Sequence, residues 1–126
     1  RRVVEAIRRL EEARGLDRRL GGHHAAAIQK VLVEPWYLDA ARAFYEKRYT
    51  DAARRTAQVL RAAPDHSLAG KLRQRIERQA DDLYAEARRL RASDPARARR
   101  LLADVVKMAG KGSSLARDAE ALSRDL

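Results

Sequence analysis

The spacing of apolar residues along this chain follows the period of an α-helix almost from end to end. Apolar side chains at intervals of three and four, with charged residues between them, predict a first helix over residues 3–13. Gly15 is expected to end this helix, because glycine is the usual residue just beyond a helix C-terminus. A short piece over residues 16–20 then leads to a break at Gly21 and Gly22.

A second helix is expected over residues 23–33. Glu34-Pro35 should end it, because proline pushes the preceding residue out of helical geometry and suits the first turn of a new helix. A kinked continuation through Pro35 is the alternative. We therefore divide the chain into two parts at Pro35. Helices over residues 1–34 form the N-terminal part, which packs on or leads into a repeat-like helical domain over residues 35–126.

Residues 36–64 predict two short antiparallel helices joined by a tight turn. The turn is expected at residues 48–51, where Thr50 or Asp51 is available as an N-cap, and Pro64 closes the second helix. Two neighbouring stripes on the first helix consist of Trp36, Ala40, Ala43 and Phe44, and of Tyr37, Ala41 and Tyr45; the inward side of the second carries Ala52, Thr56, Val59 and Leu60.

A long helix is expected over residues 68–92, which contain no proline and only one glycine, near the start. Ser93 or Asp94 then caps a helix whose first residue is Pro95. This helix ends at the glycines of residues 110–112, and Ser113 or Ser114 starts a last one. The predicted fold class is therefore all-α, built of antiparallel helical hairpins.

The hairpin over residues 36–64 resembles a tetratricopeptide repeat. The residues that match the family pattern, in order, are Trp36, Ala40, Phe44-Tyr45, Tyr49-Thr50-Asp51-Ala52, Leu60 and Pro64. Lys47 occupies the place of the usual turn glycine, and residues 83–109 match as a second, weaker unit. Ala52 and Ala98 are 46 residues apart, whereas a strict tandem array has a period of about 34, so a compact bundle of repeat-like hairpins is equally consistent.

In that family the first helix of each unit lines a concave groove that takes peptides. The resemblance therefore implies a groove lined by Tyr37, Ala41 and Tyr45, with Lys47 and Arg48 at its rim. An apolar groove with a cationic rim suits an extended or helical protein segment with acidic residues. Packing of these aromatic residues within the core, or against a neighbouring helix, is the competing interpretation.

Composition limits the classes of protein. The chain has 126 residues, a formal net charge of +10 and no cysteine, which excludes disulfides and thiolate metal sites. No apolar run approaches the roughly 20 residues needed to span a bilayer, so membrane insertion is not expected. Only five of the 28 cationic residues are lysine. The arginine surplus indicates either a surface for phosphate groups or the bias of a GC-rich genome, which raises alanine and arginine together.

Candidate chemistry is sparse. His23 and His24 point to different helical azimuths and only His66 lies elsewhere, so no zinc site is expected. Gly110-Lys111-Gly112-Ser113-Ser114 has the ingredients of a phosphate loop without its full spacing or a preceding strand, and is expected to be a turn. The acidic doublets Glu11-Glu12 and Asp81-Asp82 lack paired acid–base geometry. We expect no enzymatic activity and no cofactor.

The leading hypothesis is a cytoplasmic, non-enzymatic scaffold or adaptor module that binds a protein or peptide partner or self-associates. The chain begins without methionine, so we expect a fragment of a larger multidomain bacterial protein. The alternative is a basic helical module that binds nucleic acid, and its affinity would fall steeply with salt. A third possibility is a regulatory arm of a signalling or secretion protein.

Overall fold

The computed structural model describes residues 2–19 and 25–126, and these residues form helices joined by short turns, without a strand. The predicted all-α class is confirmed. In chain order the helices are α1 (Arg2–Arg19), α2 (Ala25–Tyr45), α3 (Tyr49–Ala62), α4 (Ser67–Leu90), α5 (Pro95–Ala109) and α6 (Ser114–Arg124).

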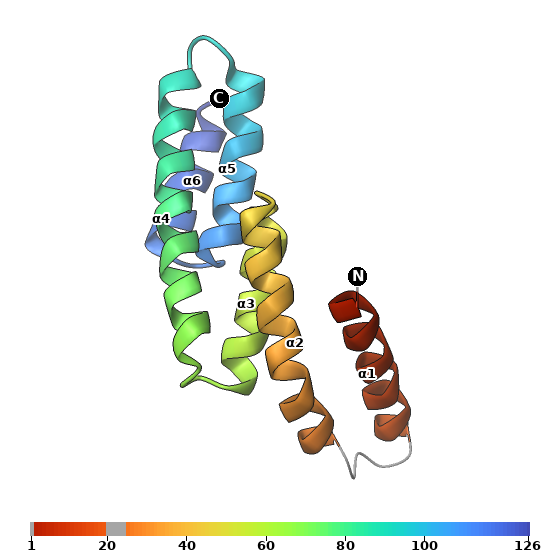
Figure 1. The fold of residues 1–126 in the computed structure, drawn as a ribbon. Helices are drawn as coiled ribbons and strands as arrows, with labels where there is room; N and C mark the ends of the chain where they lie inside the picture. Colours follow the sequence, from red (N-terminus) through yellow and green to blue (C-terminus); the bar gives the residue numbers. More distant parts are fainter. Residues whose placement is uncertain (1, 20–24) are drawn as a thin grey trace.

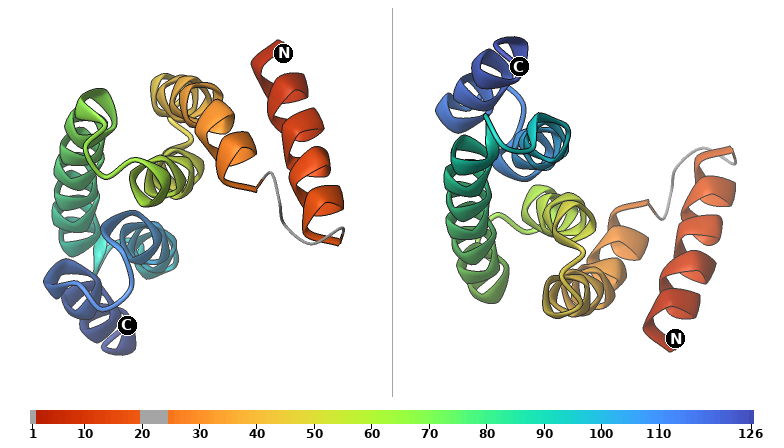
Figure 2. Two further views of the ribbon diagram at one scale, coloured as in Figure 1. Left: turned by 90° about the horizontal axis from the view of Figure 1, so that it is seen from below. Right: turned by 90° about the horizontal axis from the view of Figure 1, so that it is seen from above.

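Each helix packs antiparallel against the next, so the chain folds as a series of hairpins (Figure 1). Helix α3 also packs against α5, which joins the α2–α3 hairpin to the α4–α5 hairpin. Helices α2 and α4 run in the same direction and flank α3 on two sides (Figure 2). This arrangement places side chains of α2 and α4 on a common face of the molecule.

Small side chains dominate the core and allow the helices to approach closely. Ala40, Ala43 and Ala52 are buried where α2 meets α3, as the sequence predicts, and Ala98 is fully buried where α5 meets α4. Three apolar clusters run along the molecule: one centred on α1–α3 around Trp36, a central one around Ile76, and one in α4–α6 around Leu102.

The expected helix end at Gly15 is wrong, because α1 continues through this residue to Arg19. The space around the Gly15 Cα is open, so no neighbour forces the chain to turn there. A glycine inside a helix costs about 1 kcal/mol relative to alanine, which a flanking helical segment can offset. The residues expected as a separate piece over 16–20 belong to this same helix as far as Arg19.

The expected helix end at Glu34-Pro35 is also wrong, because Pro35 lies inside α2. The alternative of a kinked continuation describes the structure, since the two halves of α2 point in different directions (Figure 2). Proline removes one backbone donor and crowds the preceding turn, which bends a helix. Leu32 and Trp36 are buried on either side of it, so packing holds both halves in place. The division expected between residues 34 and 35 thus falls within one helix.

The turn between α2 and α3 is a Schellman motif, in which two backbone N–H groups bond back to carbonyls of the last helical turn. Arg48 N donates to Ala43 O at 2.8 Å, and Lys47 N donates to Phe44 O at 3.0 Å. Lys47 has a φ of +61°, the left-handed conformation that the usual turn glycine of the tetratricopeptide pattern adopts readily.

The predicted starts of α5 and α6 are confirmed, whereas that of α3 is not. Its N-cap is Arg48, which makes no side-chain cap bond, so the predicted cap at Thr50 or Asp51 is wrong. Asp94 caps α5 ahead of Pro95 as predicted, and of the two serines proposed for the start of α6 it is Ser113 that caps the helix.

Candidate functional site

The predicted groove residues occupy three different environments. Tyr45 is the most open, with 73% of its surface exposed near the end of α2. Tyr37 and Ala41 are half-buried on the same helix, while Lys47 and Arg48 are exposed in the following turn. Of the predicted apolar lining, Tyr45 alone therefore presents most of its side chain to solvent.

Tyr37 packs against His66, the N-cap residue of α4. Its ring centre lies 5.1 Å from that of His66, whose Nδ1 accepts a hydrogen bond from Ala69 N and so caps α4. The other ring nitrogen, Nε2, then carries the proton and donates to Glu34 Oε1 at 2.7 Å. These contacts fasten the start of α4 to α2, which gives Tyr37 a structural role whether or not it touches a partner.

A second bridge between the same two helices lies further along them. The guanidinium of Arg75 on α4 stacks 5.0 Å from the centre of the Phe44 ring and 5.8 Å from that of Tyr45. Phe44 in turn meets Tyr45 and Tyr49 edge to face. Cation–π contact orients the Arg75 charge beside the exposed tyrosine.

Large apolar side chains are exposed on both helices around this bridge. Leu38 is 51% exposed and lies seven residues before Tyr45, on the same side of α2; Leu68 is 51% exposed and lies seven residues before Arg75 on α4. We call this surface the α2–α4 face and define it by Leu38, Ala41, Tyr45, Leu68, Lys71 and Arg75.

Arg48, one of the two cations predicted at the rim of the groove, already forms ion pairs within the chain. Arg48 binds Glu46 at 2.6 Å and Asp51 at 3.3 Å, so two carboxylates already offset its charge. The hydrogen bond from Arg48, together with one from Arg42, holds the pKa of Glu46 below its usual value, and the bond to Glu46 raises the pKa of Arg48.

By contrast, Lys71 and Arg75 form no ion pair with any residue that the structure describes. The cationic side of the α2–α4 face therefore comes from α4 more than from the turn. Sequence reasoning missed these two residues, along with Leu38 and Leu68. The seven-residue spacing of Leu38 and Tyr45 could have indicated that they share one side of a helix, whereas the position of Arg75 depends on how α4 packs beside α2.

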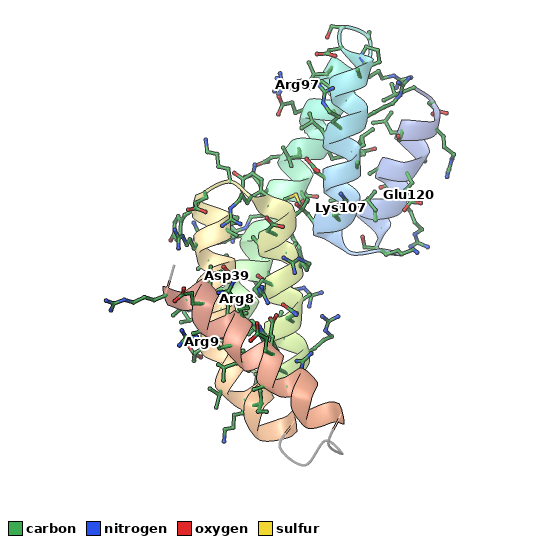
Figure 3. The ribbon with its side chains drawn as sticks, turned by 90° about the vertical axis from the view of Figure 1, so that its right-hand side faces the viewer. Arg8, Arg9, Asp39, Arg97, Lys107 and Glu120 are labelled. Carbon is green, nitrogen blue, oxygen red and sulfur yellow. The ribbon has the colours of Figure 1, made fainter. Side chains whose placement is uncertain are left out.

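A hollow lies elsewhere on the molecule, between α3, α4 and α5. This cleft has a volume of about 470 Å³. Its floor is apolar and includes Ala57, Leu60 and Met108, and Arg61 and Lys107 stand at its edge. Figure 3 shows Lys107 on the side of α5. We call this hollow the α3–α5 cleft.

The motifs that could carry chemistry have structural roles. Gly110 and Gly112 adopt positive φ in the α5–α6 turn, and Ser113 Oγ accepts from Ala116 N. Glu11 accepts hydrogen bonds from Trp36 and Arg55. No group of three or more metal-ligating side chains gathers within residues 2–19 and 25–126, while His23 and His24 lie outside the described residues.

None of the described helices combines the length and apolar character required to cross a membrane. No family model matches the chain, and neither the curated proteins nor the solved structures contain a significant match to it.

Proposed function

We propose that this chain is a non-enzymatic protein-binding module whose α2–α4 face takes an acidic amphipathic segment of a partner. The observation that carries the proposal is the exposure of Leu38, Tyr45 and Leu68 on one face of two adjacent helices. Clustered apolar side chains on a surface mark sites of protein interaction. Aromatic residues such as Tyr45 supply large contact area at small entropic cost.

The charges around these apolar residues favour an acidic partner. Lys71 and Arg75 flank the aromatic and leucine side chains from α4, and Lys47 adds a third exposed cation at the end of α2. A segment with carboxylates beside its apolar residues would complement this pattern, and the net charge of +10 would steer it toward the surface.

The resemblance to tetratricopeptide repeats supports the same surface. The first helix of the better-matching unit lies within α2, and in that family the first helices line the peptide groove. The second unit, over residues 83–109, begins in α4 beyond Leu68, Lys71 and Arg75, so the resemblance supports the α2 side of the face. We propose that the α2–α3 and α4–α5 hairpins act as a repeat-like pair in which α2 and α4 both contact the partner. A larger bacterial protein, a cytoplasmic location and self-association stay predictions.

The mechanism is binding to a surface that is already formed. The two bridges, Tyr37–His66 and Phe44–Arg75, fix α2 and α4 relative to each other before a partner arrives. Backbone groups on this face are satisfied within helices, so the partner contacts side chains only. A preformed surface loses little conformational entropy on binding, which favours affinity.

A designed helical peptide with leucines on one side and glutamates on the other tests this proposal. A twin peptide with lysine in place of every glutamate is its matched control. In NMR titrations of the ¹⁵N-labelled chain, we expect the acidic peptide to shift amide signals around Leu38, Tyr45 and Arg75, and the basic twin to leave them unchanged. Equal shifts with both peptides, or shifts confined to the α3–α5 cleft, would contradict the proposal.

A further inference from the structure

The tip of the α4–α5 hairpin carries an exceptional concentration of positive charge. Residues 88–100 contain six arginines and a single carboxylate, Asp94, and all six arginines are exposed. Thirteen residues thus hold a net charge of +5, half of the +10 of the whole chain. We call this region the arginine tip and define it by Arg88, Arg89, Arg91, Arg97, Arg99 and Arg100.

The carboxylates near the arginine tip do little to neutralise it. Asp94 is engaged as the α5 cap, where its Oδ1 accepts from Arg97 N at 3.1 Å. Glu86 accepts from the Arg97 side chain at 3.0 Å, whereas Asp94 bonds only the backbone of that residue, so Arg97 alone of the six arginines pairs with a carboxylate side chain of the described residues.

The remaining arginines of the tip keep their charge unpaired by carboxylate side chains of the described chain. Arg99 donates to the backbone carbonyl of Leu126, and Arg88, Arg89, Arg91 and Arg100 form no ion pair with a described residue. Mutual repulsion among five such charges at one end of a small domain favours an anionic partner that lies across them.

The side chains of the tip suit phosphate better than a lipid surface or an apolar protein interface. Exposed residues 91–97 are arginine, alanine, serine, aspartate and proline, and none is a large apolar group that could insert into a bilayer. Leu90 is half-buried and packs inward against the α4–α6 cluster. What the tip offers is guanidinium groups, whose planar forks match phosphate oxygens with two parallel hydrogen bonds.

The arginines of the tip form two short rows, one at the end of α4 and one at the start of α5. Arg88 and Arg91 are three residues apart at the end of α4, and Arg97 and Arg100 are three apart at the start of α5. Residues three apart lie close together on a helix surface. Two short rows of cations therefore project from adjacent helices, and no aromatic residue between 88 and 100 is available to stack on an unpaired base.

We propose that the arginine tip binds the phosphate backbone of double-stranded nucleic acid without reading its sequence. Side chains that contact phosphates fix the position of a protein on the duplex but carry no base information. The tip lies at the top of Figure 1, at the end of α4 opposite to the first turn that carries Leu68 of the α2–α4 face, so we treat this binding as separate from that of the proposed protein partner.

A salt titration of binding to a short fluorescent DNA duplex tests the inference. If about four arginines each displace a counterion, the logarithm of the association constant falls with the logarithm of salt concentration with a slope of about −4. The variant R88Q/R89Q/R91Q should reduce the magnitude of this slope by about 3 and weaken binding at low salt. Its circular dichroism melting curve should match that of the unmodified chain.

The matched control is R2Q/R8Q/R9Q, which removes the same charge from exposed positions on α1. Figure 3 shows Arg8 and Arg9 well separated from Arg97. The control should keep the original slope. An equal loss in both variants would show attraction by net charge alone and overturn the inference, as would binding to phosphatidylserine vesicles in preference to the duplex, or a slope near zero.

Discussion

Glu11 and Arg55 are separated by 44 residues in sequence, yet Glu11 Oε1 accepts a hydrogen bond from Arg55 Nη1 at 3.0 Å. The same carboxylate oxygen accepts from Trp36 Nε1 at 3.1 Å, and Arg55 Nε reaches Asp39 at 3.0 Å. The Arg55 side chain is only 13% exposed. This network ties α1, α2 and α3 together with polar contacts over the apolar cluster around Trp36.

Replacing Arg55 should therefore be costly. Arg55→Met leaves Asp39, itself only 18% exposed, without its cation, and we expect a loss of about 2 kcal/mol in the free energy of unfolding. Arg54→Met is the control, because Arg54 is 63% exposed and should change stability by less than about 0.5 kcal/mol. Urea unfolding followed by circular dichroism measures both, and equal losses would refute the structural role of the network.

Lys47→Gly should stabilise the chain by about 1 kcal/mol, because a side chain in left-handed geometry is strained and glycine is not. The same change at Lys71, inside α4 and exposed, should instead cost about 1 kcal/mol, since glycine weakens a helix interior. Thermal melting compares the two variants. A loss of stability in Lys47→Gly would mean that the turn does not have the observed conformation.

Ala52→Glu should abolish cooperative folding. Ala52 is completely buried where α3 packs against α2, so a glutamate would either bury a charge or separate the helices, at a cost above about 3 kcal/mol. Ala57→Glu places the same side chain at an exposed position of the same helix and should fold normally. The dispersion of amide signals in NMR spectra distinguishes the outcomes, and a well-dispersed Ala52→Glu spectrum would contradict this packing.

The carboxyl group of Glu46 should titrate below its ordinary pKa of 4.5, because Arg48 and Arg42 donate hydrogen bonds to the charged form. A lowered pKa in the folded state contributes stability that is present above pH 4.5 and is lost as the pH falls through the folded value. Carbon-detected NMR of the carboxyl signal follows this titration. In Arg48→Gln the midpoint should move up toward 4.5, and an unchanged midpoint would show that Arg48 is not the main cause.

Much of the fold could be predicted because local signals and packing agree. Asp94-Pro95 and Ser113 mark helix starts by cap chemistry that needs no tertiary contact, and the structure places α5 and α6 accordingly. Gly15 and Pro35 misled the prediction for the opposite reason. Their local preference for a break amounts to a few kcal/mol at most, and packing of the apolar residues around Pro35 outweighs it.

The candidate site was less predictable than the helices. The resemblance to tetratricopeptide repeats assigned Tyr45 and Tyr37 to the same groove, whereas the half-burial of Tyr37 depends on His66, 29 residues later, packing beside it. Arg75 likewise joins the face only through the packing of α4 along α2. Arg48 pairs with the carboxylates of Glu46, in the same turn, and Asp51, in the first turn of α3, and the geometry of the turn decides whether they reach it.

The affinity of the acidic designed peptide for the double variant Tyr45→Ala/Arg75→Glu tests the central claim most directly. The matched control is Leu60→Ala/Lys107→Glu, which makes the corresponding change in the α3–α5 cleft. Fluorescence anisotropy should show at least about a tenfold weaker Kd for the first variant, roughly 1.4 kcal/mol, and no change for the second. Unchanged affinity in the first variant, or the loss appearing in the second, would contradict the assignment of partner binding to the α2–α4 face.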